Sequence, residues 1–181
     1  MEPIDPETLV NSIRTATSEV FEMMLSLKVT PGEAYREPHV MKPTDGVIAL
    51  VGLAGQWMGT GILQCDAAFA CELYSHLLAA ECPTAPEGVN GDVLDAVAEI
   101  ANIIVGNVKN TLEEHLGPMG MSIPTVVFGR NFMTRGGSND PWTVVPFACE
   151  CSRMLVKICL THSPESGELR RGLPVPRGFS V

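Results

Sequence analysis

Three stretches of the chain carry apolar side chains at the three-to-four spacing of a helix that packs one face on a core. The first covers residues 6–28, the second covers residues 67–80 after the capping residue Asp66, and the third covers residues 91–116. The pattern therefore predicts three helices. The expected buried positions are Leu9, Ile13, Ala16, Val20, Met24 and Leu27, then Phe69, Leu73, Leu77 and Ala80, then Leu94, Val97, Ala101, Ile104, Val108 and Leu112.

The other apolar runs are short and rich in β-branched residues, which predicts strands. In the last run, residues 154, 156, 158 and 160 are apolar while Lys157 and Thr161 are polar, so alternate side chains are expected to face the core. This strand is expected to pair with the one before it through a turn at Glu150, and a second hairpin is expected at residues 54–56. The predicted strands are 35–41, 47–53, 57–65, 122–129, 142–149 and 153–162.

The order of these elements looks like one half-structure used twice, although the identity between the halves is too low to show a duplication. We expect an α+β fold with a mostly antiparallel six-stranded sheet and long helices packed on one face. Residues 1–163 are expected to form one domain, and residues 164–181 a mobile tail, because that segment has few apolar anchors.

Composition narrows the classes of function. The 181 residues carry a net charge of -9 and a mean hydropathy of +0.17. This acidic balance argues against binding to nucleic acid or to an anionic membrane and favours a cationic partner. The longest apolar run, residues 47–55, is far shorter than the ~20 residues that span a bilayer, and the acidic start is unlike a signal peptide. We therefore expect a cytoplasmic protein.

The six cysteines form no CxxC pair and have no histidine nearby to complete a zinc site. In a reducing compartment they are expected to be small buried side chains. Cys149 and Cys151 lie on the same side of an extended chain and could hold a soft metal, but no second pair accompanies them.

The third helix carries the most informative surface. Glu99 and Asn102 are three residues apart, so both side chains can reach one object outside the helix. Gly106 lies one turn further on, where a mid-helix glycine costs about 1 kcal/mol relative to alanine and suggests a close approach to the backbone. Ile103 and Ala96 flank this stripe, where an exposed isoleucine could contact a partner. The whole polar stripe is Asp92, Asp95, Glu99, Asn102, Gly106, Lys109, Asn110 and Glu113.

Taken alone, such a stripe is usually a solvated face. A di-metal carboxylate site is disfavoured because the chain has no Glu-x-x-His motif on this helix and no second acidic helix to match it. Acid-base catalysis by Asp95 and Glu99 remains open, although no sequence feature would raise the pKa of either.

The segment from Asp95 through Glu99 and Asn102 to Asn107 resembles the Asp/Ser-x-x-x-Glu-x-x-Asn helix signature of the CheC/CheX/FliY family, phosphatases of chemotaxis response regulators. Residues 116–129 are similar to the helix-to-strand passage of CheX proteins in particular, and the resemblance extends over residues 9–163. CheC-type members usually carry the signature on both long helices. Here the first helix has Glu19 followed by Glu22, so the resemblance implies one site per chain.

The resemblance implies that the substrate is the aspartyl phosphate of a CheY-like receiver domain, which supplies its own Mg²⁺ and a lysine. The chain itself would need no cofactor. Asn102 would position the attacking water and Glu99 would form a salt bridge to the receiver's lysine. Asp95, Ile103 and Gly106 would contact the partner, and the family resemblance further implies a homodimer formed through the sheets.

Two other functions stay open at this stage. A CheX-like binding module could dock a receiver domain or a flagellar or signalling partner without turning it over, and it could retain both Glu99 and Asn102. A sensor of a small ligand is a third hypothesis, for which the sequence shows no converging polar cluster.

Overall fold

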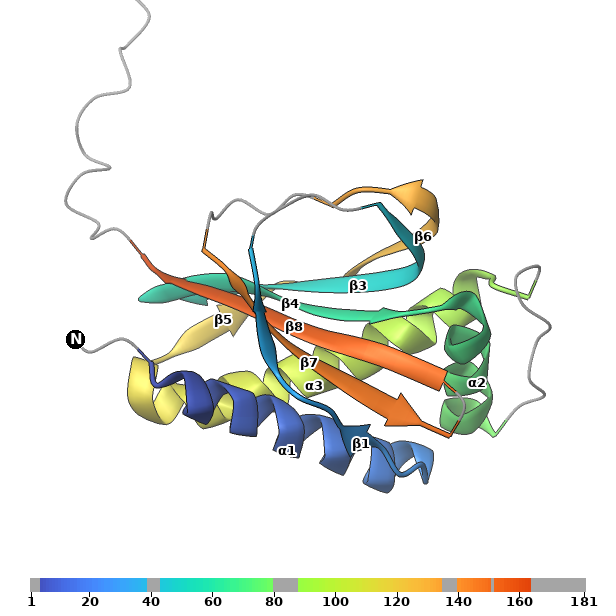
Figure 1. Cartoon of the computed structure of the whole chain (residues 1–181), viewed down its shortest axis with the longest axis horizontal. Coiled ribbons are helices and arrows are strands. Elements are labelled where there is room, and N and C mark those ends of the chain that lie inside the picture. The colour runs from blue at the N-terminus through green and yellow to red at the C-terminus, as the bar shows by residue number, and fades with distance from the viewer. Residues whose placement is uncertain (1–3, 39–42, 80–87, 135–139, 151, 164–181) are drawn as a thin grey trace, which may run out of the picture.

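The computed structural model describes residues 4–38, 43–79, 88–134, 140–150 and 152–163. Over these residues the chain forms three helices and eight strands (Figure 1). The helices are α1 (Pro6–Leu25), α2 (Ala67–Leu78) and α3 (Gly91–Leu116). The strands are β1 (Thr30–Pro31), β2 (Tyr35–Glu37), β3 (Thr44–Gly55), β4 (Trp57–Cys65), β5 (Met119–Met121), β6 (Thr125–Phe132), β7 (Trp142–Cys149) and β8 (Ser152–His162).

One sheet contains all eight strands, and every described pair is antiparallel. The order is β1-β7-β8-β4-β3-β5, with β2 also pairing with β7 and β6 also pairing with β3. The sheet is therefore six positions wide, as expected, but each edge position is shared by two strands. The expected α+β class is confirmed. The expected strand 122–129 corresponds to β6, which begins three residues later and ends at Phe132, and the sequence pattern did not predict β5.

The sheet order supports the expectation of two similar halves. The hairpins β3-β4 and β7-β8 meet at the centre, where β4 pairs with β8. The edge strands β1 and β2 of the first half pair with β7 of the second half, and β5 and β6 of the second half pair with β3 of the first. Each half therefore completes the other half's edge, which explains why the two halves fold as one unit.

The long helices α1 and α3 lie next to each other against one face of the sheet, and α2 stands at one end of it (Figure 1). The core between helices and sheet buries the expected positions of α1 up to Val20 and the expected positions of α3 from Val97 onward. Met24 is an exception: it is 39% exposed, because the buried face of the last turns of α1 passes through Phe21 and Leu25 instead. Leu77 and Leu94 are half-buried.

Two further expectations about local structure can be compared directly. Asp66 caps α2 as expected, since its carboxylate accepts a hydrogen bond from the Phe69 N–H at 2.8 Å. In β8, Met154, Val156 and Ile158 are buried in the core as the alternation predicted. The predicted tail at residues 164–181 lies outside the described residues. The same holds for Ala80, Cys82 and Cys151.

No helix among the described residues is both long enough and apolar enough to cross a lipid bilayer.

Helix α3 packs tightly against the sheet at Gly61 of β4. A Cβ atom placed on Gly61 would lie 2.5 Å from Cγ2 and 2.9 Å from Cγ1 of Val105. Val105 is 1% exposed, so its methyl groups occupy the space that a side chain on β4 would otherwise fill. A glycine is required there because the absence of a side chain lets Val105 pack directly against the strand backbone.

We predict that Gly61→Ala lowers the free energy of unfolding by about 1 to 3 kcal/mol, because the added methyl overpacks a closed contact. The double variant Gly61→Ala/Val105→Ala should be destabilised by less than the sum of the two single-variant losses, since the smaller alanine at position 105 makes room for the new methyl group. Urea denaturation of the four proteins measures this coupling. Wild-type stability of Gly61→Ala would contradict it.

Candidate functional site

Helix α3 presents its polar stripe on the side away from the sheet. The helix begins where the Asn90 side chain accepts a hydrogen bond from the Val93 N–H at 3.0 Å. Its buried residues, from Val93 to Leu116, face α1, α2 and the sheet. Asp95 and Glu99 are exposed and Asn102 is half-buried at the margin of the buried face. The expected placement of these three side chains on one outward arc is confirmed.

The side chains of Glu99 and Asn102 have no hydrogen bond or ion pair with any other residue in the described part of the chain. A carboxylate and an amide three residues apart on a helix lie about 5 to 6 Å from each other at Cβ. Between them they offer a negative charge, two amide donors and several acceptors that are not engaged within the fold. Such a pair suits a partner that brings both a cation and an oxyanion.

Gly106 is half-buried and continues the same arc one turn beyond Asn102. A Cβ atom placed there would lie 3.6 Å from Sδ and 3.7 Å from Cε of Met121, which is ordinary van der Waals contact. Packing within the described chain therefore does not require a glycine at this position. The expected approach of a partner to the helix backbone stays a prediction, and the absence of an internal reason for Gly106 supports it.

The two apolar residues that flank the arc are less exposed than the polar residues beside them. Ala96 is 5% exposed and belongs to the buried face of the helix. Ile103 is half-buried and packs against the core, so the expectation of an exposed isoleucine is wrong, while its contact with a partner through the edge of the side chain stays a prediction. Both lie on the side of α3 that closes against neighbouring elements, and the 100° spacing could not show how far that contact extends.

The first helix carries no second copy of the pair. Buried residues at positions 13, 16, 17, 20, 21 and 25 of α1 recur 80 residues later at positions 93, 96, 97, 100, 101 and 105 of α3. With this offset Glu19 corresponds to Glu99, and Glu22 corresponds to Asn102; both α1 residues are exposed. A carboxylate lacks the donors of an amide, which favours one site per chain.

Glu113 fastens β5 to the last turns of α3. Its Oε1 accepts a hydrogen bond from the Met119 N–H at 2.7 Å and lies 2.9 Å from Nζ of Lys109. The hydrogen bond from Lys109, followed by that from the Met119 N–H, lowers the pKa of Glu113 below its ordinary value. The sequence analysis placed Lys109 and Glu113 in the outward stripe but did not foresee that they hold the strand that flanks Gly106.

We predict that Glu113→Gln destabilises the protein at neutral pH, because it removes the charge that Lys109 and the Met119 N–H stabilise. A lowered folded-state pKa gives stability that is present above the ordinary pKa of a glutamate and is lost as pH falls through the folded-state value. The difference between Glu113→Gln and wild type should therefore shrink in acid.

Thermal unfolding measured from neutral to acidic pH tests this dependence. The neighbouring exposed carboxylate in Glu114→Gln is the matched control, and it should leave stability nearly unchanged at every pH. A constant offset between Glu113→Gln and wild type would contradict the role of the charge.

The described residues contain no group of three or more His, Cys, Asp or Glu side chains that could hold a metal ion. Cys65, Cys71, Cys149 and Cys159 are buried. Burial, with smaller contributions from nearby acidic groups, raises the pKa of Cys65 and of Cys149, so both thiols stay protonated at neutral pH. Cys151, the second thiol of the soft-metal pair expected with Cys149, lies outside the described residues.

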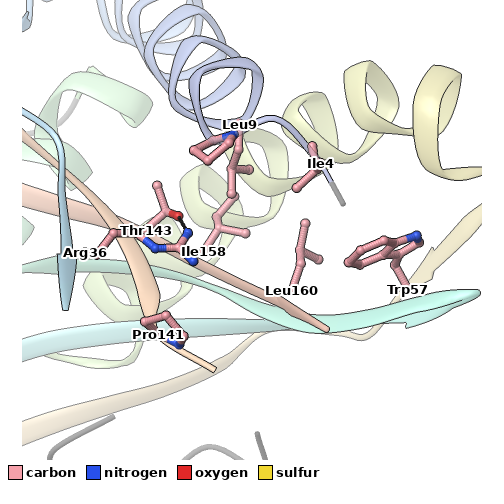
Figure 2. Close-up of a pocket in the computed structure, with 9 residues that line it drawn as sticks. Ile4, Leu9, Arg36, Trp57, Pro141, Thr143, Ile158 and Leu160 are labelled. Carbon is pink, nitrogen blue, oxygen red and sulfur yellow. Dashed lines mark hydrogen bonds between the residues drawn. The ribbon is translucent and has the colours of Figure 1, made fainter. Parts of the chain in front are cut away.

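A cavity of about 280 Å³ lies between the start of α1 and the helix-facing side of the sheet (Figure 2). Apolar side chains such as Leu9, Trp57 and Leu160 form most of its walls. Arg36, which also lines the cavity, donates a hydrogen bond from its guanidinium to Oγ1 of Thr143 at 2.7 Å. No residue of the polar stripe lines this cavity, and a single paired guanidinium is too little to identify a ligand for the sensor hypothesis.

Comparison with known structures places the fold in a class of chemotaxis proteins. CheX from Vibrio vulnificus matches with a TM-score of 0.73 and 27% identity, over 84% of this chain and 99% of that chain. CheX in the CheX-CheY-BeF3-Mg²⁺ complex from Borrelia burgdorferi matches with a TM-score of 0.68 and 25% identity, over 88% and 100%. CheX from Desulfovibrio desulfuricans, at 23% identity, shares the fold with a TM-score of 0.73 over 84% and 99%.

The family described as chemotaxis phosphatase CheX matches residues 47–148, more than half of the chain. The chain therefore belongs to the CheX chemotaxis phosphatase family, as the helix signature implied. Among curated protein sequences there is no significant match.

Proposed function

We propose that this protein hydrolyses the aspartyl phosphate of a CheY-like receiver domain, with Glu99 and Asn102 as the residues that meet the substrate. The observation that carries the proposal is the outward Glu99/Asn102 pair on α3, unengaged within the described chain, in a member of the CheX family. The CheX from Borrelia burgdorferi in complex with CheY, BeF3 and Mg²⁺ supports a receiver as the partner.

Asn102 acts by positioning water. The amide donates to an oxygen of the phosphoryl group and accepts a hydrogen from a water molecule held in line with phosphorus. Attack by this water forms one P–O bond and breaks the bond to the aspartyl oxygen, which releases inorganic phosphate and a free aspartate carboxylate. The receiver supplies the Mg²⁺ that offsets the charge on the phosphoryl oxygens, so the chain needs no metal of its own for this step.

Glu99 acts by docking. A carboxylate next to a phosphoryl dianion is repelled unless a cation pairs with it. The cation is the active-site lysine of the receiver, and the resulting salt bridge sets the register of α3 so that Asn102 lies over the phosphate. Asp95, one turn earlier, adds negative charge to the surface that meets this lysine. We expect the reaction to take place in the cytoplasm and the protein to act as a homodimer.

We predict that Asn102→Ala keeps receiver binding but loses most hydrolysis, and that Glu99→Ala weakens both, each by about 2 to 4 kcal/mol at the transition state. The measurement is the decay of several phosphorylated receivers from the same cell, each with and without the protein. Acceleration of one receiver alone would identify the substrate.

The exposed residues of the same helix provide matched controls. Asn110→Ala and Glu114→Ala remove the same chemical groups from α3 outside the pair and should retain wild-type rates. Decay at the wild-type rate with Asn102→Ala would refute the assignment. Binding without acceleration by the wild-type protein would favour the alternative, a catalytically silent docking module.

We predict that Gly106→Ala raises the free energy of unfolding by about 1 kcal/mol, since alanine favours a helix and the added methyl meets Met121 at ordinary contact distance. Gly106→Leu should leave the fold intact and raise the half-saturating concentration of the phosphorylated receiver, because the longer side chain fills the approach to the helix. Unchanged receiver binding by Gly106→Leu would remove Gly106 from the docking surface.

A further inference from the structure

The bend between β5 and β6 holds an isoleucine out in solvent. Ile123 is 86% exposed, the largest exposed fraction among the large apolar side chains that the structure describes. Isolated exposed apolar residues are common and need no explanation by themselves. Ile123 differs because its backbone is held rigidly and because of its position relative to Asn102.

Three hydrogen bonds fix the backbone around Ile123. The Ser122 N–H donates to the Gly52 carbonyl at 2.9 Å, and the Gly52 N–H donates to Oγ of Ser122 at 2.9 Å. The same hydroxyl donates to the carbonyl of Ile123 at 2.8 Å. A residue held this way loses little backbone freedom when a partner binds, which lowers the entropic cost of the contact.

The pairing register shows why the side chain projects. Gly52 bonds to Ser122 and Leu50 is paired with Thr125, so the two residues Ile123 and Pro124 lie opposite the single residue Val51. Two residues opposite one is the arrangement of a β-bulge, which bends the strand and redirects a side chain. The bulge turns Ile123 away from the core, whereas Met121 before it and Val126 after it both pack against the core.

The bulge lies between two strands that both contact α3. β5 runs antiparallel to the end of α3, because Met119 contacts Glu113 while the side chain of Met121 lies next to Gly106. Asn102 lies about one helical turn before Gly106. Ile123 follows Met121 by two residues in the direction of Asn102, so it flanks the part of the helix that carries Asn102 and Gly106.

We propose that Ile123 is a docking residue for the receiver domain and packs into an apolar depression beside the receiver's acyl phosphate. This inference rests on the proposed function. Glu99 alone gives one charged contact, about which a partner can rotate, whereas a second, apolar contact fixes the orientation of the partner. Central apolar anchors of this kind carry a large share of binding energy at protein interfaces.

The experiment compares Ile123→Ser with Ile123→Leu and with Met133→Ser, which truncates another exposed apolar residue, 57% exposed, beyond the far end of β6. Two quantities are measured for each protein: the steady-state kinetics with the phosphorylated receiver, and the affinity for the same receiver loaded with BeF3 and Mg²⁺. We expect Ile123→Ser to raise KM and the dissociation constant about tenfold with kcat changed less than twofold. Ile123→Leu and Met133→Ser should behave like wild type, and all three variants should keep the wild-type unfolding midpoint.

The outcomes separate the two proposals. If wild type binds the BeF3-loaded receiver without accelerating dephosphorylation, the proposed hydrolysis fails, and loss of affinity in Ile123→Ser still supports the docking contact. Wild-type affinity and KM in Ile123→Ser would overturn the inference while leaving the hydrolysis intact. A change from dimer to monomer with unchanged KM would also overturn it, because Ile123 would then belong to an interface between copies. Failure of wild type to bind any receiver would overturn both.

Discussion

The close contact between Gly61 of β4 and Val105 of α3 fixes the outward face of the long helix. The valine methyl groups fill the space that a side chain on β4 would need, so the helix cannot rotate without leaving a cavity or a clash. Once Val105 faces the sheet, the 100° spacing places Asn102 at the margin of the buried face and Glu99 in solvent. The orientation of the candidate site is thus a packing property of residues that never touch a partner.

The exchange of edge strands between the halves builds the surroundings of that site. α3 lies over a hairpin from the first half, and β5, which follows α3 directly, must reach across to pair with β3. Glu113 and Met121 hold this strand beside the helix, and the bulge before β6 leaves Ile123 at its flank. The polar and apolar parts of the proposed docking surface therefore come from adjacent chain segments held by contacts with the other half.

Part of the chain's excess negative charge lies on the exposed face of α3. Asp95 and Glu99 lie exposed along one arc, while Lys109 is paired with Glu113 further along the helix. The arc thus presents unpaired carboxylates near Asn102, and the bulge presents an apolar side chain. This division suits the proposed partner, a receiver that presents a lysine on one side of its phosphoryl group.

The sequence by itself determined the three helices, the order of elements, the α+β class and the arc that carries Glu99 and Asn102. These features depend on helical periodicity and caps such as Asp66, which act between residues a few positions apart. Only the tertiary structure decided that Ala96 is buried, that Ile103 packs on the core, and that the strand expected from residue 122 begins only at Thr125, after the bulge at Ile123. The burial of the two α3 residues depends on how far the neighbouring elements cover the helix. The strand boundary depends on pairing between residues about 70 positions apart, such as Gly52 and Ser122, whose register no local pattern encodes.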